Sequence, residues 1–478
     1  MANQLSIAVA FIGFLVLIVF VGIYSSSYKQ STTADYLLAS RDVNPWLTAL
    51  SAMSTGQSGA LFLGQVGFAY EIGVSAIWLT IGWAIGDYLA WLFFFKRLRE
   101  LSEDTSSDTV SDFLAQKTFG NRWISIVSGI IIIAFLGSYA AAQLVAGSKA
   151  LNVVFDWNYY LGIVLGVVIV IVYCFSGGVR AEIWTDAVQG VVMIASLLLL
   201  LVVALVHGGG FGELWTQLKA IDTQLVNFSP TNLPLGFIPF FVGWIAAGFG
   251  VIGQPHILTR AMAIDSPENV KLALNIKIIA SLITSFSALG IGLVSRVVLP
   301  DLISNGDPEL ALFYLAEDLL PTFFVGIMLA GVFAATMSTA DSQILCCSAA
   351  LTQDIAPQFA KSYRMVKLGT LTVAAIVMSI ALAGDDNVFL LVTSSWSALA
   401  AGLGPLILVR IGQLPVKTPV ALLMMIVGIV VAIAWSSVFK WSNLIYEVVP
   451  GMTAGFMVYA IAQLFERKSL ILSRLFRK

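Results

Sequence analysis

The stretch Ser54-Thr55-Gly56-Gln57-Ser58-Gly59 interrupts an apolar segment in its middle, and Gly248-Phe249-Gly250-Val251-Ile252-Gly253-Gln254-Pro255 interrupts another almost two hundred residues later. Lipid offers no hydrogen bonds, so unwound backbone at membrane depth is tolerated only where protein or a watery cavity satisfies its N–H and C=O groups. Paired breaks in corresponding positions of two halves are typical of the central site of a secondary transporter. The two stretches therefore predict a polar binding site in the middle of a membrane protein.

The composition supports a chain embedded in a lipid bilayer. Hydrophobic residues make up 59% of the sequence and charged residues 11%, with a mean hydropathy of +0.92. Soluble domains carry roughly 25% charged residues. A net charge of -2 gives no indication of a nucleic-acid partner. Cys174, Cys346 and Cys347 lie in or beside apolar runs, which favours helix packing over a disulfide or a metal site.

Segments near the ~20 residues that cross the hydrocarbon number about thirteen. The expected membrane helices are 5–25, 45–70, 74–95, 123–148, 158–175, 183–206, 234–255, 272–295, 322–350, 367–383, 388–409, 418–437 and 442–464. The first of them lacks a basic leading region, which favours a retained helix over a signal peptide.

The distribution of basic residues predicts the orientation of the chain. With the N-terminus outside and the C-terminus inside, only Lys149, Lys219, Arg296 and Lys440 fall outside, which leaves 21 of the 25 basic residues inside. Arg260 and Lys277 are counted among the inner-loop bases. The positive-inside rule then predicts a multi-pass protein of the cell inner (cytoplasmic) membrane.

The helix order predicts two sets of five helices, each opened by an interrupted segment. Because five is odd, the second set inserts upside down relative to the first, which is the inverted-repeat plan. We expect a single transmembrane domain over 1–478, with an extra N-terminal helix at 1–30, repeats at 45–210 and 233–412, and peripheral C-terminal helices at 418–465.

Four motifs carry a resemblance to a known family. They are Gly253-Gln254-Pro255-His256-Ile257-Leu258-Thr259-Arg260-Ala261-Met262-Ala263, Trp184-Thr185-Asp186-Ala187-Val188-Gln189, Met337-Ser338-Thr339 and Tyr446-Glu447-Val448-Val449-Pro450-Gly451. The chain resembles the sodium:solute symporter family, nearest its bacterial sodium/proline branch, collinearly from about Asp35 to Phe456. The resemblance implies an all-α, five-plus-five inverted-repeat (LeuT-type) fold. It also implies a symporter in which the inward Na⁺ gradient drives import of a small organic solute, proline or a related amino acid.

Oxygen-rich residues on 322–350 predict a cation site. Asp341 and Ser342 follow Ser338 at i+3 and i+4, so they share its helix face. Taken alone, such hydroxyls also bond to the preceding turn or bridge helices. The resemblance implies that Na⁺ is held by the backbone oxygens of Ser54, Gln57 and Ala335 and by the side-chain oxygens of Ser338 and Thr339.

The chain departs from the proline branch inside the first interruption. Gly56 stands where that branch has an Asp, whereas Asp341, and Asp87 in 74–95, are acids inside membrane segments. Such acids are costly to insert and functional by default. We expect Asp341 to supply part of the charge lost at Gly56; proton coupling through Asp87 or Asp341 is the alternative.

Asp186 has two interpretations. It lies near the start of the segment 183–206, where an acid complements the helix dipole. The resemblance instead implies a second ion site that pairs Asp186 with hydroxyls such as that of Ser342.

The solute pocket is expected between the two interruptions. Tyr139 and Gln143 present a hydroxyl and an amide at i and i+4, and Tyr139 matches a substrate-associated Tyr of the proline branch. The branch's aromatic pair falls on Ala247 and Val251, and Trp244, one turn from Ala247, is expected to replace part of it. The other expected lining residues are Gln57, Ser58, Gln65, Phe249, Gln254 and Pro255.

Other classes of function have weaker support. No catalytic constellation, phosphate-binding loop or metal-ligand spacing is present, so an enzyme is not expected. A channel would tolerate similar breaks, and family-like helices occur in membrane sensors, but the sequence after Phe465 leaves no room for a signalling module. Import of another zwitterion or an organic acid, coupled to Na⁺ or to protons, is the main alternative.

Overall fold

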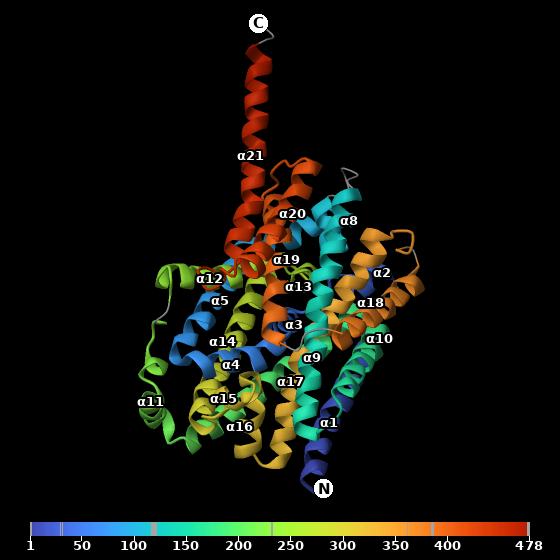
Figure 1. Ribbon diagram of the computed structural model, residues 1–478. Coiled ribbons are helices and arrows are strands. Elements are labelled where there is room, and N and C mark those ends of the chain that lie inside the picture. Colours follow the sequence, from blue (N-terminus) through green and yellow to red (C-terminus); the bar gives the residue numbers. More distant parts are fainter. Residues whose placement is uncertain are drawn as a thin grey trace.

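The computed structural model describes residues 2–28, 30, 32–115, 122–230, 233–360, 362–383 and 387–475, and it is built from helices (Figure 1). The first half contains α1 (Ala2–Ser25), α2 (Thr33–Leu38), α3 (Pro45–Gly59), α4 (Val66–Ile72), α5 (Ile77–Ala90), α6 (Lys96–Asp104), α7 (Val110–Ala115), α8 (Arg122–Ile131), α9 (Gly137–Phe155) and α10 (Tyr159–His207). The second half contains α11 (Gly210–Ile221), α12 (Phe237–Phe249), α13 (Pro255–Ala263), α14 (Val270–Val298), α15 (Leu302–Asn305), α16 (Ala311–Leu319), α17 (Thr322–Ala349), α18 (Tyr363–Ala383), α19 (Val388–Ile411), α20 (Thr418–Ile433) and α21 (Val448–Leu475). The expected all-α class is confirmed.

Within the described residues, ten helices are long and apolar enough to cross a membrane, or eleven when the bent pair formed by α12 and α13 counts as one span. The sequence predicts about thirteen. Two features explain the difference between these two counts of membrane spans. Pro45–Asp104 is one continuous helical stretch where the sequence predicts two spans, and Tyr159–Val172 is too short to be counted as a span. Gly178, with φ 60°, breaks α10 between the two spans that the sequence expects there. The count of thirteen stays a prediction.

Both predicted interruptions are confirmed. Ser58 leaves helical geometry with φ 56° and ψ -175°, and a π-helical turn over Ala60–Gln65 leads into α4. A 3₁₀ turn at Gly250–Gly253 and an extended Gln254 separate α12 from α13, and the two axes differ by 60°. A proline fits the first turn of a helix, so Pro255 begins α13 without losing a backbone hydrogen bond.

Glycines allow α5 and α12 to approach backbone to backbone. A Cβ on Gly86 would lie 1.9 Å from the carbonyl oxygen of Ile245, and one on Gly248 would lie 2.0 Å from the carbonyl oxygen of Trp83. Small residues serve this purpose in membrane bundles, where apolar burial gives no driving force between helices. The contact fixes the end of α12, and hence its break, against α5.

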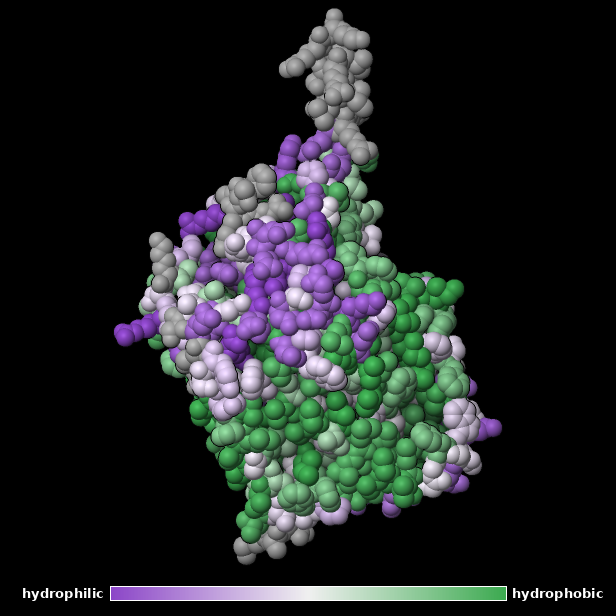
Figure 2. Space-filling model, turned by 180° about the vertical axis from the view of Figure 1, so that it is seen from behind, coloured by the Kyte–Doolittle hydropathy of each residue, from purple (hydrophilic) through white to green (hydrophobic). Residues whose placement is uncertain are grey.

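The surface has the polarity of a membrane protein. On the face seen in Figure 2, apolar side chains form a broad band, and hydrophilic side chains gather at the end nearer α21. The N-terminus and the end of α21 lie at opposite ends of the bundle (Figure 1). The chain is therefore a multi-pass membrane protein whose apolar band faces lipid.

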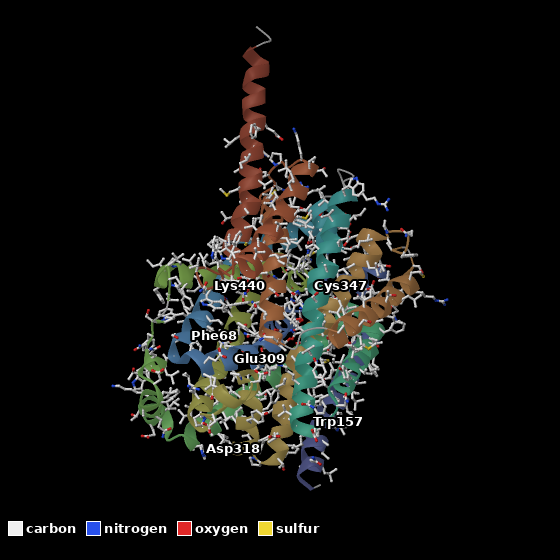
Figure 3. All side chains as sticks on the ribbon, viewed as in Figure 1. Phe68, Trp157, Glu309, Asp318, Cys347 and Lys440 are labelled. Atoms are coloured by element: carbon white, nitrogen blue, oxygen red, sulfur yellow. The ribbon has the colours of Figure 1, made fainter. Side chains whose placement is uncertain are left out.

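The segment between α15 and α16 is tied to the bundle at the end opposite α21. Glu309 is labelled in Figure 3. It accepts hydrogen bonds from Lys149 Nζ of α9 at 3.0 Å and from the backbone N–H of Phe389 at 3.0 Å. Lys149 also pairs with Asp307 at 3.1 Å. These contacts join α9, the α15–α16 segment and the start of α19.

Candidate solute cavity and ion sites

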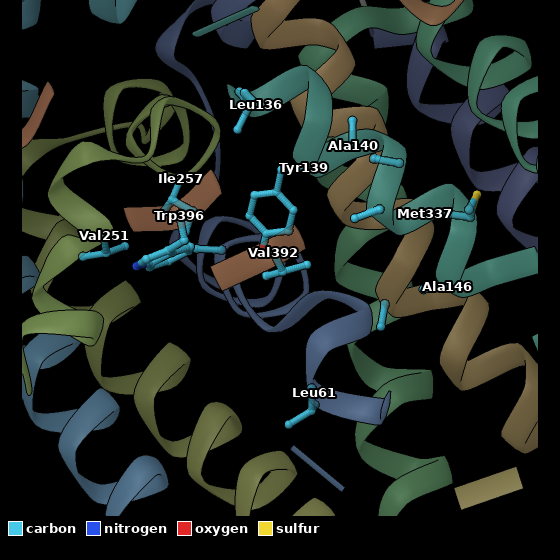
Figure 4. Close-up of a cluster of buried hydrophobic side chains, with 14 of the residues drawn as sticks. Leu61, Leu136, Tyr139, Ala140, Ala146, Val251, Ile257, Met337, Val392 and Trp396 are labelled. Atoms are coloured by element: carbon cyan, nitrogen blue, oxygen red, sulfur yellow. The ribbon is translucent and has the colours of Figure 1, made fainter. Parts of the chain in front are cut away.

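A cavity lies beside the break in α3, between α5, α14 and α19. Its empty volume is about 860 Å³, including space open to solvent. In the close-up of Figure 4, Tyr139 of α9 lies opposite Trp396 and Ile257, with Val392 next to the Tyr139 ring. The polar side chains that line it are Gln57, Ser58, Gln65, Thr80, Asp87, Tyr139, Lys277, Ser281, Ser285 and Thr393.

The cavity includes part of the expected solute pocket. Of the residues named from the sequence, Gln57, Ser58, Gln65, Tyr139 and Val251 line it. The residues that lie outside its lining are Gln143, Trp244, Ala247, Phe249, Gln254 and Pro255.

The residues outside the lining have other contacts. Trp244 stacks on Tyr446 at 5.5 Å between ring centroids, and Phe249 packs edge-on against Phe94. Pro255 lines a second, smaller pocket. These side chains therefore belong to the packing near the second break and not to the cavity lining.

Tyr139 and Gln143 both hold the broken segment of α3. The Tyr139 hydroxyl donates to Ser58 Oγ at 3.2 Å, and Gln143 Oε1 accepts the backbone N–H of Gly59 at 2.7 Å. Ser58 Oγ also accepts the backbone N–H of Ala60 at 3.2 Å. Gln143 therefore satisfies a backbone donor that the break exposes, as unwound backbone at membrane depth requires, and Tyr139 holds the Ser58 hydroxyl that satisfies a second one.

Trp396 of α19 occupies the place near Ala247 that the sequence assigned to Trp244. Its indole N–H donates to the carbonyl of Ala247 at 2.8 Å, and its own carbonyl accepts a hydrogen bond from Gln254 Nε2 at 3.0 Å. Trp83 of α5 lies 5.0 Å away between ring centroids. Nothing in the local sequence distinguished this Trp from other apolar residues of α19, so sequence reasoning missed it.

A buried ion pair joins α5 to α14 at the cavity. Lys277 Nζ donates to Asp87 Oδ2, and both residues line the cavity with at most 6% of their surface exposed. Lys277 lies 5.5 Å from the centre of the Trp91 ring. The assignment of Lys277 to an inner loop is therefore wrong: the residue lies inside α14, where its charge is compensated by Asp87.

Hydroxyls and carbonyls of α3 and α17 meet at the predicted sodium site. Thr339 Oγ1 lies 3.0 Å from the carbonyl oxygens of both Ala335 and Thr55. Ser338 Oγ lies 3.1 Å from the same Ala335 oxygen. Ser54, on α3, directly precedes Thr55. This set of neutral oxygens suits a hard cation.

A second cluster lies between α10, α13 and α17. Glu182, Asp186 and Asp341 are buried, and each offers a carboxylate oxygen within 4.8 Å of the others. Arg260 of α13 donates to Glu182, and to Asp186 at 3.0 Å. The assignment of Arg260 to an inner loop is therefore wrong, because its surface is 0% exposed.

Hydroxyls connect this cluster to the sodium site. Arg260 donates to Ser342 Oγ, and Thr55 Oγ1 lies 2.7 Å from Ser342 Oγ and 2.6 Å from the carbonyl of Ser338. Ser51 Oγ donates to Asp186 at 2.7 Å. Asp186 therefore contacts α3 and α13, so its role is not limited to complementing the dipole near the start of a helix.

Glu182 was missed from the sequence although a signal existed. It precedes Asp186 by four residues, the spacing that places two side chains on one helix face. Lys277 had a signal as well, because it lies within the expected span 272–295 and intramembrane charges are functional by default.

Comparisons with known proteins agree with this architecture. The model of the sodium:solute symporter family matches residues 36–428. The chain belongs to the sodium:solute symporter family. The symporter is 31% identical to the high-affinity proline transporter PutP of Bacillus subtilis (strain 168), over 91% of this chain and 93% of that protein. It is 32% identical to the sodium/proline symporter of Staphylococcus aureus (strain JH9), over 95% of this chain and 91% of that protein.

Solved structures show the same fold. A Na⁺-coupled sialic acid symporter in a substrate-bound outward-open state matches with a TM-score of 0.77 at 20% identity, over 95% of this chain and 96% of that one. A nucleobase-cation-symport-1 family transporter in a closed conformation matches with a TM-score of 0.58 at 16% identity, over 92% and 96%. The expected LeuT-type class is confirmed.

Family membership settles the class of activity. The protein is a sodium-coupled symporter of a small solute and not an enzyme, and Na⁺ is its coupling ion. The lipid bilayer surrounds it.

Proposed function

We propose that this symporter imports proline or a related amino acid by alternating access, driven by the inward Na⁺ gradient. Similarity over nine-tenths of the chain to two transporters named for proline carries the proposal. The cavity supports it, because the aromatic side chains of Trp83, Tyr139 and Trp396 line it together with polar groups that can orient a small solute.

The proposed sodium site uses the backbone oxygens of Ser54, Gln57 and Ala335 and the side-chain oxygens of Ser338 and Thr339. The hydrogen bond from Thr339 to the carbonyl of Thr55 supports it, since it brings α3 and α17 within ligand distance of a common ion. A cation placed there bridges the two helices and holds the outward-open form.

A second ion site is proposed at Asp186, Asp341 and Ser342, next to Glu182. Arg260 pairs with Glu182 and Asp186, and Asp341 lies beside these two acids, so the three acids and this one guanidinium have a formal charge of -2 (-3 + 1) when all are ionised. Buried charge of one sign needs a counter-ion. This surplus supports Na⁺ as the ligand, and it supplies charge that Gly56 does not.

The proposed placement is the inner membrane of a bacterial cell, with the N-terminus outside and the C-terminus inside. The hydrophilic end beside α21 supports this orientation (Figure 2). Residues 45–210 and 233–412 form the proposed inverted repeats, with the two confirmed breaks at corresponding places.

The test of the function is uptake of radiolabelled L-proline into proteoliposomes at fixed pH, with external Na⁺ or choline. We expect accumulation only with a Na⁺ gradient, because solute and ion raise each other's affinity by the same factor. Undiminished uptake in choline would rule out sodium coupling and favour the proton-coupled alternative. Absence of proline uptake alongside uptake of another solute would rule out the proposed substrate only.

The sodium site has its own test. Ser338→Ala combined with Thr339→Ala removes two oxygens, and we expect the Na⁺ concentration for half-maximal uptake to rise at least about tenfold, since a hydrogen bond or ligand contact to a charged group contributes about 1.5–3 kcal/mol. The matched control is Thr336→Val, because the Thr336 hydroxyl bonds to Phe333 within its own helix. An unchanged sodium dependence in the double variant would contradict the site.

A further inference from the structure

The ion pair between Asp87 and Lys277 is the charged part of the solute cavity. No other Asp, Glu, Lys, Arg or His occurs among the described residues that line it. The four sequence motifs that carry the family resemblance contain neither Asp87 nor Lys277.

One oxygen of the pair is available to a ligand. Asp87 Oδ2 accepts Lys277, but Asp87 Oδ1 is buried and is the only buried side-chain polar atom of the described cavity lining without a hydrogen-bond partner. A buried carboxylate oxygen without a donor is costly. A solute N–H group would satisfy it.

Two backbone N–H groups at the first break already have hydrogen-bond partners, so they do not compete with Lys277 for the carboxylate of a solute. The N–H of Gly59 is bonded to Gln143 and that of Ala60 to Ser58 Oγ. Lys277 has three donor hydrogens, of which Asp87 takes one. Lys277 is therefore the cationic donor that remains for a carboxylate in the cavity.

We propose that Asp87 and Lys277 read the two charges of a zwitterionic solute, with the carboxylate on Lys277 and the ammonium on Asp87 Oδ1. The proposal rests on the proposed function and deepens it by placing the charged end of the solute between α5 and α14. The pair has a formal charge of zero, so a zwitterion adds two matched charges and leaves none unpaired. A solute with one net charge leaves one charge without a partner in a low-dielectric cavity.

The first experiment changes the solute and keeps the protein intact. L-proline, L-proline methyl ester and N-acetyl-L-proline compete against uptake of radiolabelled L-proline by wild-type proteoliposomes in Na⁺. We expect the ester, which lacks the carboxylate, and the acetyl compound, which lacks the ammonium, to inhibit about 100-fold more weakly than proline, since losing one partner of a desolvated charge pair has effects of this order. Inhibition by either analogue within about threefold of proline would overturn the proposal.

The second experiment repeats the competition on Asp87→Asn combined with Lys277→Gln. Both charges are removed together, so no buried charge is left alone. We expect the discrimination between proline and its two derivatives to fall below about tenfold. The matched control is Glu309→Gln combined with Lys149→Gln, another acid–lysine pair, which lies outside the cavity lining; its discrimination should stay at the wild-type value. Full discrimination in the cavity double variant would assign the pair a structural role only and overturn the proposal.

The outcomes separate this proposal from the proposed function. If alanine or another zwitterion is taken up with Na⁺ but proline is not, the proposed substrate fails, and the same derivatives of that amino acid test the pair. If only sugars, organic anions or organic cations are taken up, the charge-reading proposal is wrong while sodium coupling stands.

Discussion

Two buried charged clusters lie close to the first broken helix, and they differ in charge balance. Asp87 and Lys277 form a one-to-one pair at the cavity. Glu182 and Asp186 both pair with Arg260, and Asp341 lies beside them, away from the cavity lining. A balanced pair accepts a ligand with balanced charges, whereas a surplus of acid accepts a cation. Under the two proposals, the ratio of acids to bases is what selects a zwitterion at the first cluster and a metal ion at the second.

The clusters also differ in what each joins. The cavity pair connects α5 with α14, whereas Arg260 connects α13 with α10 and, through hydroxyls, with α3 and α17. The acid-rich cluster therefore lies where the pieces of both broken helices meet the rest of the bundle. A change there should affect folding and ion coupling together.

The largest expected effect is that of Arg260→Met. Removing the guanidinium leaves the buried carboxylates of Glu182 and Asp186 without the base that pairs with them, and breaking a buried pair costs about 3–5 kcal/mol. We expect a lower Tm in detergent and no detectable uptake. Arg260→Lys keeps the charge but loses the planar fork, so it should recover only part of the Tm. A wild-type Tm for Arg260→Met would mean that the acids carry no charge there.

Lys277→Met tests the ion pair of Asp87 and Lys277 in the same way. It leaves one buried carboxylate alone, so we expect a destabilisation of about 3 kcal/mol, whereas Asp87→Leu combined with Lys277→Met should lie within about 1 kcal/mol of wild type. Thermal unfolding of the three proteins measures both values. Equal stability of the single and double variants would show that the two charges do not interact.

Asp186→Asn sharpens the proposed cation site by removing one negative charge without changing shape. We expect the Na⁺ concentration for half-maximal uptake to rise about tenfold, equivalent to about 1.4 kcal/mol. Asp156→Asn on the exposed turn after α9 is the control. An unchanged sodium dependence would exclude Asp186 from ion binding.

Thr55→Val should have the smallest effect. The hydroxyl of Thr55 links the carbonyl of Ser338 with Ser342 Oγ, and thereby the sodium site with the acid-rich cluster. Its loss costs about 1 kcal/mol, so we expect about a fivefold rise in half-maximal Na⁺. Measured together with Asp186→Asn, additive effects would show that the two sites act independently.

The broken helices were predictable because backbone geometry follows from local sequence. Clustered glycines and small polar residues at Ser54–Gly59, and Pro255 after Gly253 and Gln254, disfavour a continuous helix in any context. Tyr139 lines the cavity as expected from the sequence, whereas Gln143, one turn further on, lies outside the lining and bonds to the backbone of Gly59. The assignment of Arg260 and Lys277 to loops failed because counting charges by segment ignores what each side chain can pair with.

The sequence by itself determined the membrane class, the two breaks, the family and the oxygen-rich face of α17, because composition, helix periodicity and turn chemistry are local properties. Only the tertiary structure decided which charges meet. Lys277 follows Asp87 by 190 residues and Arg260 follows Glu182 by 78. The packing of α5 on α14, and of both α10 and α13 on α3, brings them together. An ion pair is a property of distance in space, and distance in space is set by helix packing rather than by position along the chain.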